Sequence, residues 1–141
     1  MYDQFTERSQ KVMTRANEEA HRSNHEYIGS EHLLLWLVEE ARDALESLGV
    51  NAQEVRVELR KTWKSGHTQV TAGERPLTPR ARRIIEYAIK ESLDLKHVGV
   101  EPEHLLLGLA HEQYAVSGQI LLTLNVKLVQ IRERLERQAR N

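Results

Sequence analysis

The amino-acid sequence predicts an all-α protein made of two tandem, pseudo-symmetric copies of one four-helix repeat. Helix-favouring Leu, Ala, Glu and Arg dominate the 141 residues, whereas proline occurs only three times and strand-forming residues are sparse. A shift of 72 residues also aligns positions 5–37 with 77–109 without a gap and gives eleven identical pairs. We therefore expect about eight helices in a single domain over residues 1–141.

The matching residues also predict where each repeat begins and ends. Thr6 aligns with Thr78, and the Glu-His-Leu-Leu-Leu run at 31–35 aligns with 103–107. Further along, the matching shift grows to 76, which makes the first copy four residues shorter, in a turn near 39–42. The expected boundaries are repeat one at 5–63, an exposed linker without helical periodicity at 64–76, and repeat two at 77–139.

Each helix of the first copy has a local signal. Thr6 can cap the first helix, because its side-chain oxygen can accept a backbone N–H of the opening turn. A buried stripe with i, i+4 spacing then continues along that helix at Val12, Ala16 and Ala20. The second helix is expected to begin at Ser30 after Gly29, the third to cover Ala44–Leu48, and the fourth to follow a capping Asn51 and run to about Thr62.

The second copy repeats these signals. Thr78 precedes Pro79, which suits the first helical position because its missing N–H would have no partner there. The buried stripe recurs at Ile84, Ile85, Ala88 and Ser92.

Charge and composition exclude several classes of function. Twenty basic and twenty-one acidic residues leave a net charge of −1, which argues against a nucleic-acid partner bound by counterion release. The cluster Arg80–Arg83 is accordingly interpreted as a solvated helix face. The sequence has no cysteine, no apolar run of about 18 residues and no recognisable signal peptide. We expect a cytoplasmic protein with no membrane partner.

No catalytic constellation or cofactor motif is found. The sequence lacks the P-loop pattern GxxxxGK[ST] and the nucleophile elbow GxSxG, so no catalytic residue and no cofactor are predicted. The alternative from this class is a metal-dependent enzyme that uses some of the seven histidines, such as the i, i+4 pair His21 and His25. There is no HExxH motif, however, and we instead expect His32 and His104 to be partly buried hydrogen-bonding groups.

One repeated pattern can be interpreted in two ways. Glu31 and Glu103 each fall in the first turn of a predicted helix, while Thr6 and Thr78 stand at the start of others. These residues could simply stabilise helix ends, by a few tenths to about 1 kcal/mol each. They could also form a dipolar pocket, since free amides attract an anion and a nearby carboxylate attracts a cation. Such a pocket would suit a ligand with both charges.

The same residues resemble a known family. The runs at 5–12, 24–34 and 78–86 strongly resemble the Clp N-terminal repeat domain, above all that of ClpC-type AAA+ unfoldases. The resemblance extends from Phe5 to about Leu135. It implies two four-helix repeats about a pseudo-two-fold axis, in a non-catalytic module that recruits substrate and adaptor proteins to a AAA+ Clp unfoldase, which in turn feeds a ClpP-type peptidase.

The resemblance also implies a ligand. In ClpC relatives this domain reads phosphoarginine, and the corresponding residues here are Thr6, Glu31, Thr78 and Glu103. We expect the first site, with Glu31 beside Thr6, to bind better than the second, with Glu103 beside Thr78. The second copy has Glu101-Pro102 where the family has Gly-Thr, which adds a negative charge and removes an amide donor. The first copy has Trp36 where the family usually has glycine. The alternative is a free-standing docking or regulatory module without phosphoarginine binding.

Overall fold

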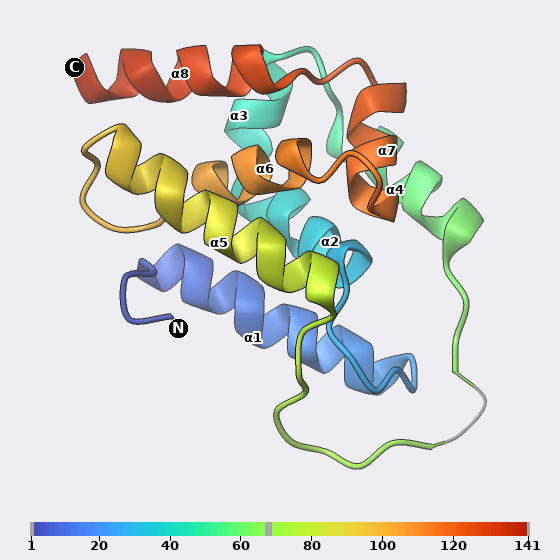
Figure 1. Ribbon diagram of the computed structural model, residues 1–141. Coiled ribbons are helices and arrows are strands. Elements are labelled where there is room, and N and C mark those ends of the chain that lie inside the picture. Colours follow the sequence, from blue (N-terminus) through green and yellow to red (C-terminus); the bar gives the residue numbers. More distant parts are fainter. Residues whose placement is uncertain (1, 67–68, 141) are drawn as a thin grey trace.

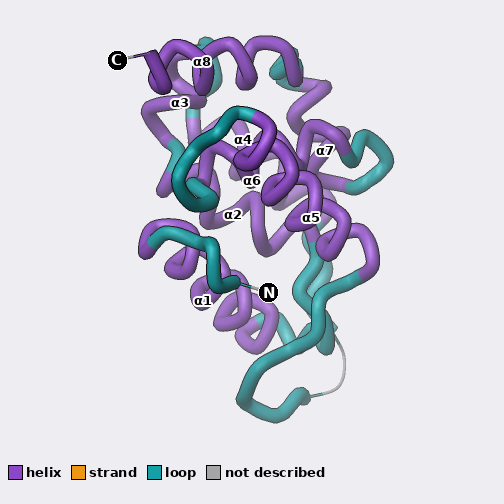
Figure 2. Tube along the Cα trace, turned by 60° about the vertical axis from the view of Figure 1, so that its left-hand side comes forward, coloured by secondary structure: helices purple, strands orange, loops and turns teal. Residues whose placement is uncertain are grey.

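The computed structural model describes residues 2–66 and 69–140, with side chains described as far as residue 137. Over these residues the chain forms eight helices and no strand, which confirms the all-α prediction (Figure 2). In chain order they are α1 (Glu7–Arg22), α2 (Ser30–Glu40), α3 (Arg42–Ser47), α4 (Ala52–Thr62), α5 (Pro79–Asp94), α6 (Pro102–His111), α7 (Val116–Thr123) and α8 (Leu128–Arg140). None of the helices in the described part is long and apolar enough to cross a membrane.

The two copies pack around a central pair of apolar helices. α1 packs on α2, α5 packs on α6, and α2 lies against α6 in the middle of the molecule (Figure 1). Each first helix, α1 or α5, also contacts the second helix of the other copy. All leucines of α2 and α6 except the partly buried Leu35 form the centre of the core and are fully buried: Leu33, Leu34, Leu37, Leu105, Leu106, Leu107 and Leu109.

The backbone just before the first helix of each copy pairs with the backbone of the other copy. Phe5 forms a parallel β-bridge with Val100, and Leu77 forms the matching bridge with Ile28. The Thr6 N–H donates to the Val100 carbonyl at 3.2 Å, and the Thr78 N–H donates to the Ile28 carbonyl at 2.9 Å. These contacts are related by the 72-residue shift, so each copy begins its first helix against the loop that precedes the second helix of the other copy.

The predicted helix caps are confirmed at both threonines. Thr6 Oγ1 accepts the Ser9 N–H at 3.4 Å, and Thr78 Oγ1 accepts the Ala81 N–H at 3.1 Å. Asn51 caps α4 by accepting the Gln53 N–H at 2.7 Å.

Both boundaries of the third helix were predicted wrongly. α3 covers Arg42–Ser47 instead of Ala44–Leu48. The Ala41 carbonyl already accepts the Leu45 N–H at 3.1 Å, so the helix restarts immediately after the corner that ends α2.

The segment between α4 and α5 is not helical in its described residues and is mostly exposed, as expected. It is nevertheless attached to the first copy. Arg75 Nε donates to the His25 carbonyl and its backbone N–H donates to Asn17 Oδ1, both at 2.9 Å. Residues 67 and 68 of the predicted linker 64–76 lie outside the described residues, and the repeat boundaries at 5–63 and 77–139 stay predictions.

Candidate functional site

The four predicted site residues come together in two places, each shared between the copies. Glu31 and Thr78 line two adjoining hollows of about 440 and 460 Å³. Thr6 lies against Val100, next to the start of α6 where Glu103 stands. The expected pairing of Glu31 with Thr6, and of Glu103 with Thr78, is therefore wrong, because the crossed backbone bridges place each threonine beside the other copy's glutamate.

The Glu31–Thr78 site combines a free carboxylate with helix-terminal and arginine donors. The Glu31 side chain is 30% exposed, and within the described part of the chain it forms no ion pair with lysine or arginine. Thr78 caps the start of α5, and Arg80 and Arg83 line the same hollow. Arg80 donates to the Tyr114 carbonyl, whereas Arg83 Nε pairs with the Glu112 carboxylate at 2.6 Å. The hollow thus presents donors for an anion beside an acceptor for a cation.

Gly29, just before α2, leaves space for the Glu31 carboxylate. The Glu31 carboxylate folds back over Gly29, so that a Cβ added to Gly29 would lie 2.3 Å from Glu31 Oε1. Any larger residue at this position would displace the carboxylate. The aligned position in the second copy is Glu101, so the Glu103 carboxylate has a different neighbour.

The Thr6–Glu103 site is already occupied by a guanidinium of the same chain. Arg8 Nη1 lies 2.9 Å from Glu101 Oε2, and Arg8 Nη2 lies 3.4 Å from Glu103 Oε2. Partial burial works to lower the pKa of Arg8, but the carboxylates of Glu103 and Glu101 outweigh this effect and raise it above its usual value. The Glu103 side chain is only 11% exposed. This site therefore satisfies its carboxylate internally.

Sequence reasoning did not assign this role to Arg8. The available signal was its identity with Arg80 at the 72-residue shift, two positions after each capping threonine.

Paired histidines hold the loops that lead into α2 and α6. His32 Nδ1 accepts the Gly29 N–H at 2.9 Å, and His32 Nε2 lies 2.8 Å from His25 Nδ1. In the second copy, His104 contacts the Glu101 N–H and His97 at 2.8 Å each. Burial, and secondly the neighbouring histidine, lower the pKa of His32 and His104 to about 4. Both form hydrogen bonds, as predicted, although they are fully rather than partly buried.

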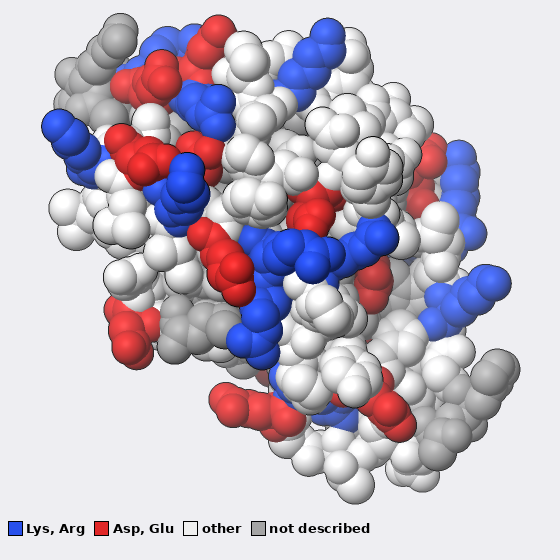
Figure 3. Space-filling view, in the orientation of Figure 1, with Lys and Arg blue, Asp and Glu red and all other residues white. Residues whose placement is uncertain are grey.

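The described residues contain no group of three His, Cys, Asp or Glu side chains placed to hold a metal ion. Charges of both signs are mixed on the surface around α5. Figure 3 shows lysine and arginine side chains gathered near the middle of one face, with acidic side chains directly beside them. Arg83 on α5 forms an ion pair with Glu112.

Comparison with known proteins gives consistent matches. The family model described as the Clp repeat (R) N-terminal domain matches residues 4–124 and again 76–141. The ATP-dependent Clp protease ATP-binding subunit ClpA homolog of Guillardia theta is 40% identical over 141 residues, which cover 97% of this chain but only 17% of that protein. The chain therefore spans less than a fifth of the length of this curated relative.

Solved structures of similar fold include the N-terminal domain of ClpD from Arabidopsis thaliana. It has a TM-score of 0.75 and 22% sequence identity, with 100% of this chain and 97% of that chain covered. A ClpV N-domain in complex with a VipB peptide has a TM-score of 0.76 and 16% identity, with 94% and 84% covered. At these identities the two structures show the fold alone.

Proposed function

The chain belongs to the Clp repeat N-terminal domain family, and from this premise we propose that it recruits substrate or adaptor proteins to a AAA+ Clp unfoldase by binding phosphoarginine between Glu31 and Thr78. The family model covers almost the whole chain. The role that we infer for it is recognition, and other modules would supply the ATPase and ClpP-type peptidase activities. The cytoplasmic location expected from the sequence stays a prediction.

The observation that carries this proposal is the free Glu31 carboxylate opposite the start of α5. Phosphoarginine joins a guanidinium to a phosphate, so its two ends need an anion and a set of donors a few ångströms apart. Glu31 would receive the guanidinium, which can form two parallel hydrogen bonds with a carboxylate. The Thr78 hydroxyl and the guanidinium groups of Arg80 and Arg83 would receive the phosphate.

The second site offers an internal precedent for the guanidinium half of this contact. Glu103 aligns with Glu31, and it holds the guanidinium of Arg8 through contacts of 3.4 and 3.5 Å. A glutamate in the first turn of this helix is thus well placed to bind an arginine side chain. At the Glu31 site the aligned arginine, Arg80, contacts the Tyr114 carbonyl instead, which leaves the Glu31 carboxylate for an incoming ligand.

The comparison with ClpV supports the protein-recognition part of the proposal. A ClpV N-domain, which shares the fold, is described in complex with a VipB peptide. The ClpA homolog is named as a subunit of an ATP-dependent protease, which supports an unfoldase as the partner of this chain.

Calorimetric titration of phosphoarginine into the wild type, Glu31→Gln and Glu103→Gln tests the proposal. The wild type should bind one equivalent, and Glu31→Gln should lose roughly 1.5–3 kcal/mol, or about tenfold or more in affinity. Glu103→Gln is the matched control and should change affinity little, because Arg8 already occupies that carboxylate. Phosphoserine should not bind, since it has no cation for Glu31.

Two results would contradict this assignment in different ways. If titration of the wild type with millimolar phosphoarginine produces no heat of binding, the alternative is favoured, which is a docking module without phosphoarginine binding. A larger loss from Glu103→Gln than from Glu31→Gln would move the site to Thr6 and Arg8.

A further inference from the structure

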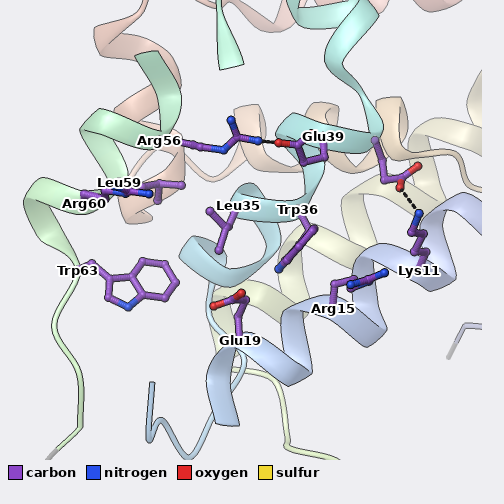
Figure 4. A pocket seen from close by; sticks show the side chains of 11 residues that line it. Lys11, Arg15, Glu19, Leu35, Trp36, Glu39, Arg56, Leu59, Arg60 and Trp63 are labelled. Atoms are coloured by element: carbon purple, nitrogen blue, oxygen red, sulfur yellow. Dashed lines mark ion pairs between the residues drawn. The ribbon is translucent and has the colours of Figure 1, made fainter. Parts of the chain in front are cut away.

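A separate groove of about 640 Å³ lies between α1, α2 and α4 (Figure 4). Its apolar walls come from four side chains. Leu35 stands between the rings of Trp63 and Trp36, and Leu59 projects from α4 (Figure 4). The volume falls within the range of roughly 300–1,000 Å³ that is typical of ligand pockets. Of the residues that line this groove, only Trp63 also lines a hollow that contains Glu31.

Trp36 distinguishes this groove from the same place in the second copy. It aligns with Gly108, where a Cβ would lie 2.2 Å from the Ile84 carbonyl oxygen. α5 and α6 therefore pack in close contact there, which an indole would prevent. In the first copy the ring of Trp36 instead stacks under the guanidinium of Arg15, whose Cζ is 5.3 Å from the ring centre.

Side chains of the second copy fill the space that is open in the first. Tyr87, aligned with Arg15, stacks on His111 with a centroid distance of 4.5 Å. Arg132 of α8 reaches Glu91, aligned with Glu19, at 2.8 Å. The residues that line the groove in the first copy are therefore replaced in the second by side chains that contact one another across the equivalent helices.

The charges at the rim leave two cations available. The three carboxylates of the lining are already paired: Glu40 with Lys11 at 3.2 Å, Glu39 with Arg56, and Glu19 with Arg22. Arg15 and Arg60 are exposed and have no carboxylate partner among the residues that the structure describes. The groove thus joins apolar walls to two guanidinium groups that have no carboxylate partner in the described part of the chain.

We propose that this groove binds an acidic peptide segment of a partner protein, with a large apolar side chain packed on Leu35 and the two indole rings and carboxylates on Arg15 and Arg60. The aromatic walls favour burial of a Leu or Phe side chain. The free guanidinium groups favour acidic over neutral or basic neighbours in the peptide. This surface is distinct from the Glu31 site and would select partners by sequence, independently of phosphoarginine.

Tryptophan emission reports directly on the groove, because the chain has two tryptophans and both line it. The probe is the acetylated and amidated tetrapeptide Glu-Leu-Phe-Asp, which adds no tryptophan or tyrosine. Its titration should change the emission in a saturable manner. The peptides Gln-Leu-Phe-Asn and Glu-Ser-Ser-Asp, which lack the charges or the apolar side chains, should bind about threefold to tenfold more weakly.

Surface variants then locate the binding. Arg15→Gln combined with Arg60→Gln keeps both tryptophans and should weaken Glu-Leu-Phe-Asp binding by about tenfold. Lys61→Gln, next to Arg60 on α4 but outside the groove lining, is the matched control and should leave binding unchanged. Both arginines are exposed, and circular dichroism with thermal unfolding verifies that the double variant folds. Glu31→Gln should leave this peptide's affinity unaltered, which separates the groove from the phosphoarginine site.

Three results would overturn the proposal. The first is a wild-type emission that does not respond to millimolar Glu-Leu-Phe-Asp, and the second is equal binding of Gln-Leu-Phe-Asn. The third is undiminished affinity in the folded double arginine variant. Sedimentation tests one more alternative. If the emission change occurs because the protein associates with itself, the groove binds a second copy of this chain, and the proposed acidic partner is wrong.

Discussion

At the scale of single residues, two glutamates in the same motif differ because of one neighbour. Gly29, two residues before Glu31, leaves room for the Glu31 carboxylate to fold back beside the loop and stay free of cations in the described chain. Glu101 stands two residues before Glu103, and together the two carboxylates hold Arg8. The motif alone therefore does not determine whether its glutamate is free to bind a ligand. That depends on whether the nearby arginine of the same chain pairs with the glutamate.

The buried histidines predict a pH-dependent stability. His32 and His104 have pKa values of about 4 in the folded chain, against about 6.5 in an unfolded one. The unfolded chain therefore binds more protons below pH 6.5, and the free energy of unfolding should fall as the pH decreases from about 6.5 towards 4, by up to roughly 3 kcal/mol for each histidine. Urea unfolding at several pH values in this window measures the effect.

A matched variant isolates the contribution of His32 from that of the carboxylates. Asparagine at position 32 cannot be protonated and can still offer an oxygen to the Gly29 N–H. His32→Asn should consequently show a weaker fall in stability between about pH 6.5 and pH 4 than the wild type. An identical fall in both proteins would show that His32 is not the titrating group.

At the scale of helices, the pairs α1–α2 and α5–α6 occupy equivalent positions in the two copies, but the residues at the contact between the two helices differ. Gly108 lets α6 approach the α5 backbone, whereas Trp36 occupies the aligned position in α2. The residue at this position is one of those that distinguish the α5–α6 interface from the α1–α2 pair beside the groove.

Gly108→Ala should destabilise the protein. Alanine improves helix propensity by about 1 kcal/mol. Its Cβ would lie 2.2 Å from the Ile84 carbonyl oxygen, so α5 and α6 must separate along a well-packed interface. We expect a net loss of about 1–3 kcal/mol, measured by urea unfolding. Lys90→Ala, which alters an exposed pair on α5, should change stability by less than about 0.5 kcal/mol. Unchanged or increased stability of Gly108→Ala would contradict the close approach of the two helices.

At the scale of the whole molecule, the two copies share one core, and the residues that precede the first helix of each copy bond to the other copy. α2 and α6 bury their leucines against each other, and the bridges Phe5–Val100 and Ile28–Leu77 join the copies at both ends of the pseudo-symmetric pair. Both candidate phosphoarginine sites are formed across this boundary. Neither copy contains a complete site.

The shared core predicts that the copies depend on each other for folding. Fragments 1–70 and 71–141, produced separately, should each lack a cooperative thermal transition, because each exposes the apolar face that the other covers. Mixed at equal concentration, they should form a one-to-one complex with the helical circular dichroism of the intact chain. Cooperative unfolding of an isolated fragment would show instead that each repeat is an independent folding unit.

The sequence by itself determined the all-α class, the two copies and the caps at Thr6 and Thr78. These features depend on neighbours within one or two helical turns, so spacing and residue type are enough to reveal them. Only the tertiary structure decided that Glu31 belongs with Thr78, that Arg8 fills the site of Glu103, and that a groove opens beside Trp36. These features depend on contacts between segments far apart in the chain, whose pairing follows from how the two copies cross and pack.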